Sequence, residues 1–289
     1  MSSSIIRTVV GDISADEARR PLTHEHLIFS REDTPGAADA LRRLRARMDR
    51  DMATLAATGC NLLTDVSPIG YLRWGDLFRR VYGRTGIRVV AATGGYAERY
   101  LPAWFARLSA DRMAERLTRE VEEGIAGQGM RAGILKAASG YRTPEGPGER
   151  LFHAVVAAHR CTGAPITCHS FPGLAAHAAF FRAQRLDPEK VALGHVEANA
   201  WPDVRAAARA GWMLCFTNLG SERVVPDDVA QGQIVALLRR GHLRQILLSS
   251  DFRYRIRGGV VRAVWPHRRY DHVFTGFAPR LRALGVSAR

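Results

Sequence analysis

The sequence T-H-E-H at residues 23–26 places two imidazoles two positions apart in a short apolar segment. Such a segment is typical of a β-strand, in which side chains alternate between the two faces. His24 and His26 would then point to one face and Glu25 to the other. Two imidazoles on one face of a strand can share a metal ion, although one of them could instead be a histidine packed in the core.

Three further polar residues also end apolar runs. His169 lies at the end of ITCH, His195 at the end of ALGH, and Asp251 at the end of ILLSSD. The other histidines fall in predicted helices or loops, where a solvated or hydrogen-bonded imidazole is the ordinary explanation. Imidazole and carboxylate ligands without cysteine suit Zn²⁺, Mn²⁺ or Co²⁺ at a hydrolytic site.

The chain contains only two lysines, Lys136 and Lys190. Lys136 lies in the apolar run AGILKAA. Burial disfavours the ammonium and lowers its pKa. A neutral amine could form a Schiff base with a carbonyl substrate, or react with CO₂ to give a carbamate that bridges two metal ions. The Schiff-base interpretation leaves the histidines without a role. A lysine whose amine reaches solvent is the structural alternative.

The elements that must position these residues are short apolar runs alternating with longer helical patterns, one of which opens with the favourable N-cap Ser109. The apolar runs, rich in Ile, Leu, Val and Ala, occupy residues 21–26, 60–66, 87–94, 132–138, 164–170, 190–196, 212–218 and 245–251. Strands covered on both faces have this composition. Eight such units predict a closed (β/α)₈ TIM barrel, whose strand ends meet at one C-terminal rim. An open doubly wound sheet is the alternative, but no G-x-G-x-x-G follows the first strand. We expect residues 1–289 to form a single domain.

Composition limits the classes of partner. The net charge of +14 could indicate nucleic-acid binding, but the arginines are spread along the whole chain, so we expect no nucleic-acid partner. No apolar run approaches the roughly 20 residues of a membrane span, and the N-terminus lacks the pattern of a signal peptide. The four cysteines form no C-x-x-C pair, which favours reduced thiols in a cytoplasmic protein.

Taken together, these motifs resemble the phosphotriesterase family, with its phosphotriesterase-like lactonases, in the amidohydrolase superfamily. The order H-x-H, Lys, His, His, Asp on predicted strands 1, 4, 5, 6 and 8 carries the resemblance. It covers nearly the whole chain, through segments such as VVGDISADEARRPLTHEHL, EVEEGIAGQGMRAGILKAAS and ILLSSDF. The resemblance implies a hydrolase with a binuclear metal centre, commonly zinc, at the C-terminal rim of the barrel, with manganese or cobalt as alternatives.

The resemblance also implies a role for each residue. The more buried ion would be held by His24, His26 and Asp251. The more exposed ion would be held by His169 and His195. Lys136, as N6-carboxylysine, and a hydroxide would bridge the two ions. Asp251 would also take the proton from the attacking hydroxide. Tyr96 matches a tyrosine that lactonase relatives place near the metals, although a tyrosine packed at the rim explains it equally well.

The chain also departs from the family pattern. The resemblance implies a further helix after FAPRLRALGV. We expect the barrel of this chain to lack that helix. Ser250 stands where many lactonase relatives have histidine, which indicates a difference in the substrate pocket. The loop after the last strand carries Arg253, Arg255 and Arg257. They could attract an anionic substrate, or they could simply be loop residues of an arginine-rich chain.

The function expected from these observations is hydrolysis of a small-molecule lactone or related carboxylic ester by attack of hydroxide held by the metals, with phosphotriester hydrolysis as a side activity. Three alternatives stay open: phosphoric triester hydrolysis as the main activity, a Schiff-base lyase that uses Lys136, and a barrel that binds ligand without turnover. The oligomeric state also stays open, with a homodimer among the alternatives.

Overall fold

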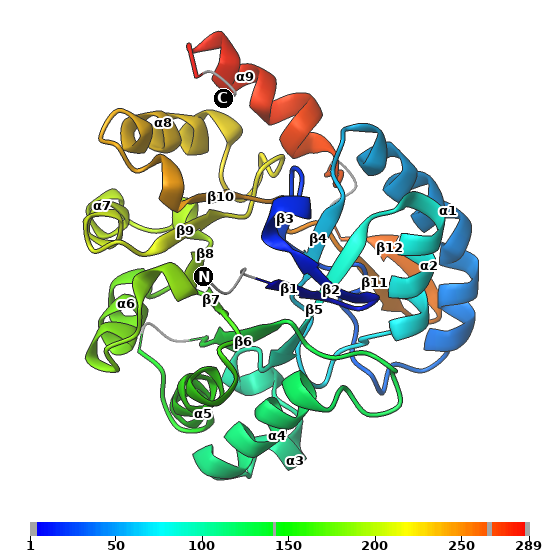
Figure 1. Cartoon of the computed structure of the whole chain (residues 1–289). Helices are drawn as coiled ribbons and strands as arrows, with labels where there is room; N and C mark the ends of the chain where they lie inside the picture. The colour runs from blue at the N-terminus through cyan, green and yellow to red at the C-terminus, as the bar shows by residue number, and fades with distance from the viewer. Residues whose placement is uncertain (1–4, 141–142, 265–267, 287–289) are drawn as a thin grey trace.

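Eight parallel strands form the centre of the molecule and follow one another around the sheet in chain order (Figure 1). The computed structural model describes residues 5–140, 143–264 and 268–286. The strands are β3 (Leu22–Glu25), β4 (Leu62–Asp65), β5 (Arg88–Gly94), β6 (Ile134–Ala138), β7 (Ile166–His169), β8 (Val191–Gly194), β9 (Met213–Phe216) and β10 (Ile246–Leu248). Each lies within one of the predicted apolar runs, and the predicted (β/α)₈ barrel is confirmed.

Helices surround this sheet on its outer side (Figure 1). They are α1 (Ala37–Ala57), α2 (Gly75–Thr85), α3 (Ala103–Ala106), α4 (Ala110–Glu122), α5 (Pro147–Thr162), α6 (Leu174–Ala183), α7 (Trp201–Arg209), α8 (Asp227–Leu238) and α9 (Ala278–Ala283). Short 3₁₀ or π segments lie at Ala15–Glu17, Glu98–Tyr100, Pro188–Lys190, Val196–Ala198, Leu243–Gln245 and Val273–Phe277. The Ser109 side chain accepts a hydrogen bond from the backbone N–H of Arg112 and so caps α4, as the sequence predicts. Gly163 ends α5 in the left-handed conformation that favours glycine.

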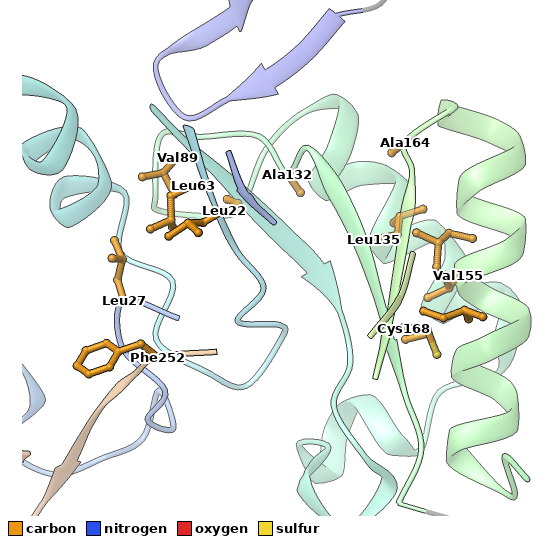
Figure 2. Close-up of a cluster of buried hydrophobic side chains, with 14 of the residues drawn as sticks. Leu22, Leu27, Leu63, Val89, Ala132, Leu135, Val155, Ala164, Cys168 and Phe252 are labelled. Atoms are coloured by element: carbon orange, nitrogen blue, oxygen red, sulfur yellow. The ribbon is translucent and has the colours of Figure 1, made fainter. Parts of the chain in front are cut away.

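The main core lies between the outer face of the strands and these helices. On β6, Leu135 faces Val155 of α5, and Cys168 of β7 packs in the same cluster (Figure 2). Because side chains alternate along a strand, Lys136 next to Leu135 points into the barrel. One cluster of buried apolar side chains extends along the chain from Val9 to Leu281. The single domain expected for residues 1–289 stays a prediction.

Two small antiparallel hairpins accompany the barrel. The first pairs β1 (Ile5–Thr8) with β2 (Gly11–Ser14), and its turn is joined to β5 by the 2.8 Å hydrogen bond from Val9 N to Val89 O. The second follows the last barrel strand and pairs β11 (Tyr254–Arg257) with β12 (Val260–Ala263). Within the described residues, no helix has the length and apolar character needed to cross a membrane.

The barrel closes between its first and last strands mainly through side-chain contacts, beside one backbone hydrogen bond from His26 N to Phe252 O at 3.1 Å. No strand ladder joins β3 to β10 in the described part of the chain. Instead, the buried carboxylate of Glu25 accepts hydrogen bonds from the Ser249 hydroxyl (2.7 Å), from the Ser250 backbone N–H (2.7 Å) and from the Phe252 backbone N–H (2.8 Å). The Ser249 hydroxyl in turn accepts the backbone N–H of His24 at 2.9 Å. We call this set of contacts the seam.

Replacing Glu25 by alanine should therefore destabilise the fold. The change leaves two buried backbone donors, on Ser250 and Phe252, without their acceptor. We expect a loss of about 2–5 kcal/mol and a fall in Tm of roughly 5–15 °C, measured by thermal unfolding. Glu122→Ala, at an exposed position of α4, is the matched control and should melt within about 1 °C of the wild type. A Glu25→Ala variant that melts with the control would mean that other contacts close the barrel.

Candidate metal centre

Three predicted ligands meet where the first and last barrel strands end. His24 lies in β3, His26 follows β3, and Asp251 follows β10. One potential ligand atom from each lies within 4.8 Å of the others, and all three residues are buried. The Nε2 atom of His26 is 3.5 Å from Oδ1 of Asp251. These three side chains are close enough to bind one ion.

Lys136 joins this group from the far side of the barrel interior. Its Nζ atom lies 3.3 Å from Nε2 of His24, and the side chain is 1% exposed. The His24 ring centroid is 5.0 Å from that of His195, which is 4.1 Å from that of His169. These contacts bring the side chains of all six predicted ligands together at the C-terminal rim. Their roles as ligands stay predictions.

Burial keeps the imidazoles of this cluster neutral. It lowers the pKa of His26 to about 3 and the pKa of His24, His169 and His195 well below the ordinary value. It also lowers the pKa of Lys136 to about 8. The neutral imidazole nitrogens carry the free lone pairs that metal coordination requires, and the lowered pKa of Lys136 increases the share of neutral amine that reaction with CO₂ requires.

Asp251 is the one carboxylate of the cluster and stays ionised. Burial alone would raise its pKa, but the Arg253 guanidinium, His26 and Arg268 together lower it below the ordinary value. Arg253 Nη1 lies 2.5 Å from Asp251 Oδ2. Asp251 has a φ of 47° and His195 a φ of 58°, the left-handed region that is unusual for residues other than glycine. Such strained backbone is typical of functional sites, where it aims a side chain that an extended strand would send elsewhere.

A second layer of polar groups orients the histidines, and the sequence interpretation did not identify it. The Ser67 hydroxyl lies 2.8 Å from Nδ1 of His26, and the Thr217 hydroxyl lies 2.5 Å from Nδ1 of His195. Glu197 accepts the backbone N–H of Thr217 at 3.1 Å. Contacts of this kind fix the ring orientation of ligating histidines. Each of these residues follows a strand end by at most three positions, and this placement was the available signal.

Arg268 links the segment that carries Asp251 to the side chain that contacts His195. Its guanidinium donates to the backbone carbonyl of Ser250 at 2.8 Å and to Oδ1 of Asn218 at 3.1 Å. Asn218 Nδ2 lies 3.3 Å from Nδ1 of His195. The contact with Ser250 also restrains the neighbouring Asp251. No spacing in the sequence indicates this role, because Arg268 reaches the site from a loop beyond the second hairpin.

Two buried carboxyls that the sequence interpretation passed over fix the backbone around the ligands. Asp65 accepts the backbone N–H of Leu27 at 2.7 Å and that of Ser67 at 2.9 Å. Burial raises the pKa of Asp65 to about 6 and that of Glu25 in the seam to about 7. Glu25 points away from its neighbours in the T-H-E-H segment, as the alternation of a strand predicts.

Aromatic rings lie beside two of the predicted ligands. The ring of Tyr96 lies 5.4 Å from that of His169 and 5.5 Å from that of Phe29, whose ring is 4.5 Å from that of His26. Burial raises the pKa of Tyr96, so its hydroxyl stays protonated and can donate a hydrogen bond. Tyr96 therefore lies beside one of the predicted ligands, and its role at the site stays a prediction.

The three loop arginines occupy different positions. Arg253 pairs with Asp251, and both Arg253 and Arg255 lie over the Phe29 ring, at 5.6 and 5.7 Å from its centroid. Arg257 is exposed at the far end of β11. The structure thus brings Arg253 to the ligand cluster, places Arg255 on the Phe29 ring beside it, and leaves Arg257 on the surface of the hairpin.

The residues present fit a metal centre. Neutral imidazoles, one ionised carboxylate and a buried amine of lowered pKa form a nitrogen- and oxygen-rich donor set that suits zinc and similar divalent ions. Gly194 leaves room for the first ligand, because a Cβ at this position would lie 3.3 Å from the His24 ring.

Comparison with known proteins agrees with this geometry. The family model described as "Phosphotriesterase family" matches residues 4–289. The "Phosphotriesterase homology protein" of Escherichia coli is 29% identical, with 95% of this chain and 94% of the relative covered. The "Phospho-furanose lactonase" of Mycoplasmopsis synoviae is 22% identical over 99% of this chain and 88% of the relative.

Solved structures give the same result. The organophosphorus hydrolase from Deinococcus radiodurans superposes with a TM-score of 0.88 at 26% identity, and the match covers 99% of this chain and 93% of that one. The family match and the structural match both extend over almost the whole chain. This chain therefore belongs to the phosphotriesterase family and is one of its hydrolases.

Proposed function

We propose that this protein is a binuclear metal-dependent hydrolase that opens a lactone or a related carboxylic ester. The observation that carries the proposal is the contact of Lys136 Nζ with Nε2 of His24, 3.3 Å apart in the barrel interior. A lysine aimed at a histidine among further neutral imidazoles is unfavourable as an ammonium. It is well placed as a carbamate, whose oxygens would lie among metal ligands.

The proposed ligand sets follow the contacts of the side chains. His24, His26 and Asp251 would hold the more buried ion, since they lie close enough to share it. His169 and His195, in ring contact with each other, would hold the second ion. Carboxylated Lys136 would serve both ions. We propose zinc as the metal, with manganese and cobalt as the alternatives for this donor set.

The chain's own side chains would carry the remaining steps. Bound divalent ions would polarise the scissile carbonyl and lower the pKa of coordinated water. Asp251, which Arg253 and Arg268 keep ionised, would accept a proton at its carboxylate. The protonated hydroxyl of Tyr96, whose ring lies beside His169, would orient the substrate by hydrogen bonding.

The choice of a lactone over a phosphotriester rests on the relatives and on the aromatic rings beside the ligand cluster. One relative is named a phospho-furanose lactonase and one structural neighbour an organophosphorus hydrolase, so both substrate classes occur among similar proteins. Phe29, Tyr71, Tyr96 and Tyr100 form an aromatic wall beside His26 and His169, with ring contacts from 4.2 to 6.2 Å. A flat lactone ring fits against such a wall. Phosphoric triester hydrolysis is the alternative main activity.

A Schiff-base lyase that uses Lys136 is the alternative from another enzyme class. The pKa of about 8 at Lys136 would suit it, but the lyase needs no histidines around the amine. Borohydride added with substrate would trap Lys136 covalently in a lyase, and chelation would leave its activity intact.

The cellular setting is proposed on the cysteines. All four are free thiols in the structure, in line with a reducing compartment such as the cytoplasm. We also propose that, apart from the metal ions, the protein binds a small-molecule substrate.

Lys136→Ala should lose metal and activity together, because the change removes the ligand shared by both proposed ions. We expect at least a hundredfold lower kcat and fewer than about one ion per chain by elemental analysis. Short carboxylic acids should restore part of the activity by supplying the missing oxygens. Lys190→Ala, which removes the exposed lysine, is the control. Normal metal content and rate in Lys136→Ala would exclude the bridging role.

Asp251→Asn should reduce kcat by roughly a hundredfold or more, because an amide cannot accept the proton. Steady-state kinetics on the best lactone or ester measures this. Asp228→Asn changes an exposed carboxylate of α8 in the same way and should leave kcat unchanged. Turnover at the wild-type rate in Asp251→Asn would remove this carboxylate from the mechanism.

Metal dependence and substrate class can be measured in one screen. Lactones, carboxyl esters and phosphotriesters are offered to chelator-treated protein, before and after addition of Zn²⁺, Mn²⁺ or Co²⁺. We expect activity only after metal addition, with kcat/KM highest on a lactone. Undiminished activity after chelation would contradict the proposed centre, and a phosphotriester as the best substrate would favour the alternative activity. Metal binding without turnover on any class would indicate a ligand-binding barrel.

A further inference from the structure

The β11–β12 hairpin carries a row of arginines that the proposed mechanism does not use. Arg255 of β11 lies directly opposite Arg262 of β12 in the antiparallel register, and Arg257 lies two residues along from Arg255. All three therefore project from the same face of the hairpin. Like charges directly opposite one another destabilise a strand pair. The stability of the fold therefore gives no reason for placing these arginines together.

The direction of the arginine face is fixed by the opposite face of the hairpin. Tyr254 and Ile256 are buried there. The backbone N–H of Phe29 donates to the Tyr254 carbonyl at 2.8 Å, and the backbone N–H of Ile256 donates to the Ser30 hydroxyl at 2.7 Å. The hairpin is thus attached to the segment that follows β3.

A tight turn between the two strands sets their alignment. Gly258 and Gly259 have φ values of 54° and 70°, the conformation of a two-residue turn that matches the twist of paired strands. The turn keeps Arg255 and Arg262 opposite each other and holds the three charges close together.

Arg255 connects this face to the metal centre. Its Nε atom donates to the Phe29 carbonyl at 3.4 Å, and its guanidinium lies over the Phe29 ring. His26 is another neighbour of that ring, at 4.5 Å between ring centroids. A single aromatic ring thus separates Arg255 from a proposed ligand, while the terminal nitrogens of its guanidinium stay available to a bound molecule.

A hollow of about 260 Å³ lies along the arginine face, lined by Arg255, Arg257, Arg262, Ala263 and Val264. Its charge is uncompensated: among the residues that the structure describes, no carboxylate lies within ion-pair distance of any of the three arginines. Arg253, in contrast, is paired with Asp251. Neighbouring Arg253 and Arg257 add to burial in lowering the pKa of Arg255, as expected for cations held together without a counter-ion.

We propose that this hollow binds a phosphate monoester group of the substrate, while the ester or lactone bond lies at the metal centre beyond Phe29. Arginine guanidinium groups bind phosphate oxygens in pairs of parallel hydrogen bonds, and a dianion matches three adjacent cations better than a carboxylate does. The inference rests on the proposed function for the position of the reacting bond and adds the class of substrate. A neutral phosphotriester makes no use of this surface.

Equilibrium binding tests the hollow without relying on turnover. D-ribose 5-phosphate and D-ribose differ by the phosphate and contain no carboxylic ester, and isothermal calorimetry measures both against the wild-type protein. We expect the phosphorylated sugar to bind at least tenfold more tightly. In Arg262→Ala and Arg255→Gln this preference should fall by about tenfold. Arg209→Ala, which removes an exposed arginine at the end of α7, should retain it. Equal affinity for the two sugars, or an unchanged preference in both variants, would overturn the proposal.

Kinetics then separates this inference from the proposed function. A γ-lactone with and without a terminal phosphate is offered to the same proteins. A higher kcat/KM on the phosphorylated lactone, reduced about tenfold in Arg262→Ala, supports both proposals. Phosphate-dependent binding without hydrolysis of any lactone or ester leaves the hollow supported and refutes the hydrolase. Hydrolysis of both lactones at equal kcat/KM in every protein supports the hydrolase and refutes the hollow.

Discussion

The buried carboxylate of Glu25 is the constraint on which the rest of the site depends. It accepts hydrogen bonds from the last strand and from the segment after it, and it lies between His24 and His26 in the sequence. Asp251 lies between Ser250 and Phe252, the two residues whose backbone N–H groups the carboxylate holds. The contact that closes the barrel thus also sets the distance between the proposed ligands of one ion. Stability and metal geometry depend on the same few atoms.

Burial acts on every ionisable group of this site, and the neighbours decide the outcome. It keeps the imidazoles neutral, lowers the pKa of Lys136 and raises the pKa of Glu25. Arg253 and Arg268 reverse the effect at Asp251 alone. The chain can therefore hold neutral nitrogen donors and one ionised carboxylate in the same buried space. A basic composition serves this purpose, because two well-placed guanidinium groups are enough to select which carboxyl stays charged.

Much of this arrangement could be predicted from the sequence because strand ends are local signals. Apolar runs followed by His or Asp indicated the barrel and its rim, and strand alternation predicted that Glu25 faces away from His24 and His26. The partners that orient the site could not be predicted in the same way. The pairing of Thr217 with His195 joins adjacent strands, and Arg268 arrives from a loop. Such contacts depend on packing between distant segments, for which a single sequence contains no periodic pattern.

The seam has a consequence for the order in which the molecule is made. Its bonds join residues separated by 224 to 227 positions in the chain, so they cannot form until synthesis has passed Phe252. Until then the β3 edge has no partner on its open side, and His24 and His26 have no Asp251. Loop closure over such separations is slow, and unpaired strand edges favour aggregation. The nascent chain is therefore most vulnerable just before the segment from Ser249 to Phe252 emerges, and the proposed metal centre is among the last parts of the fold to assemble.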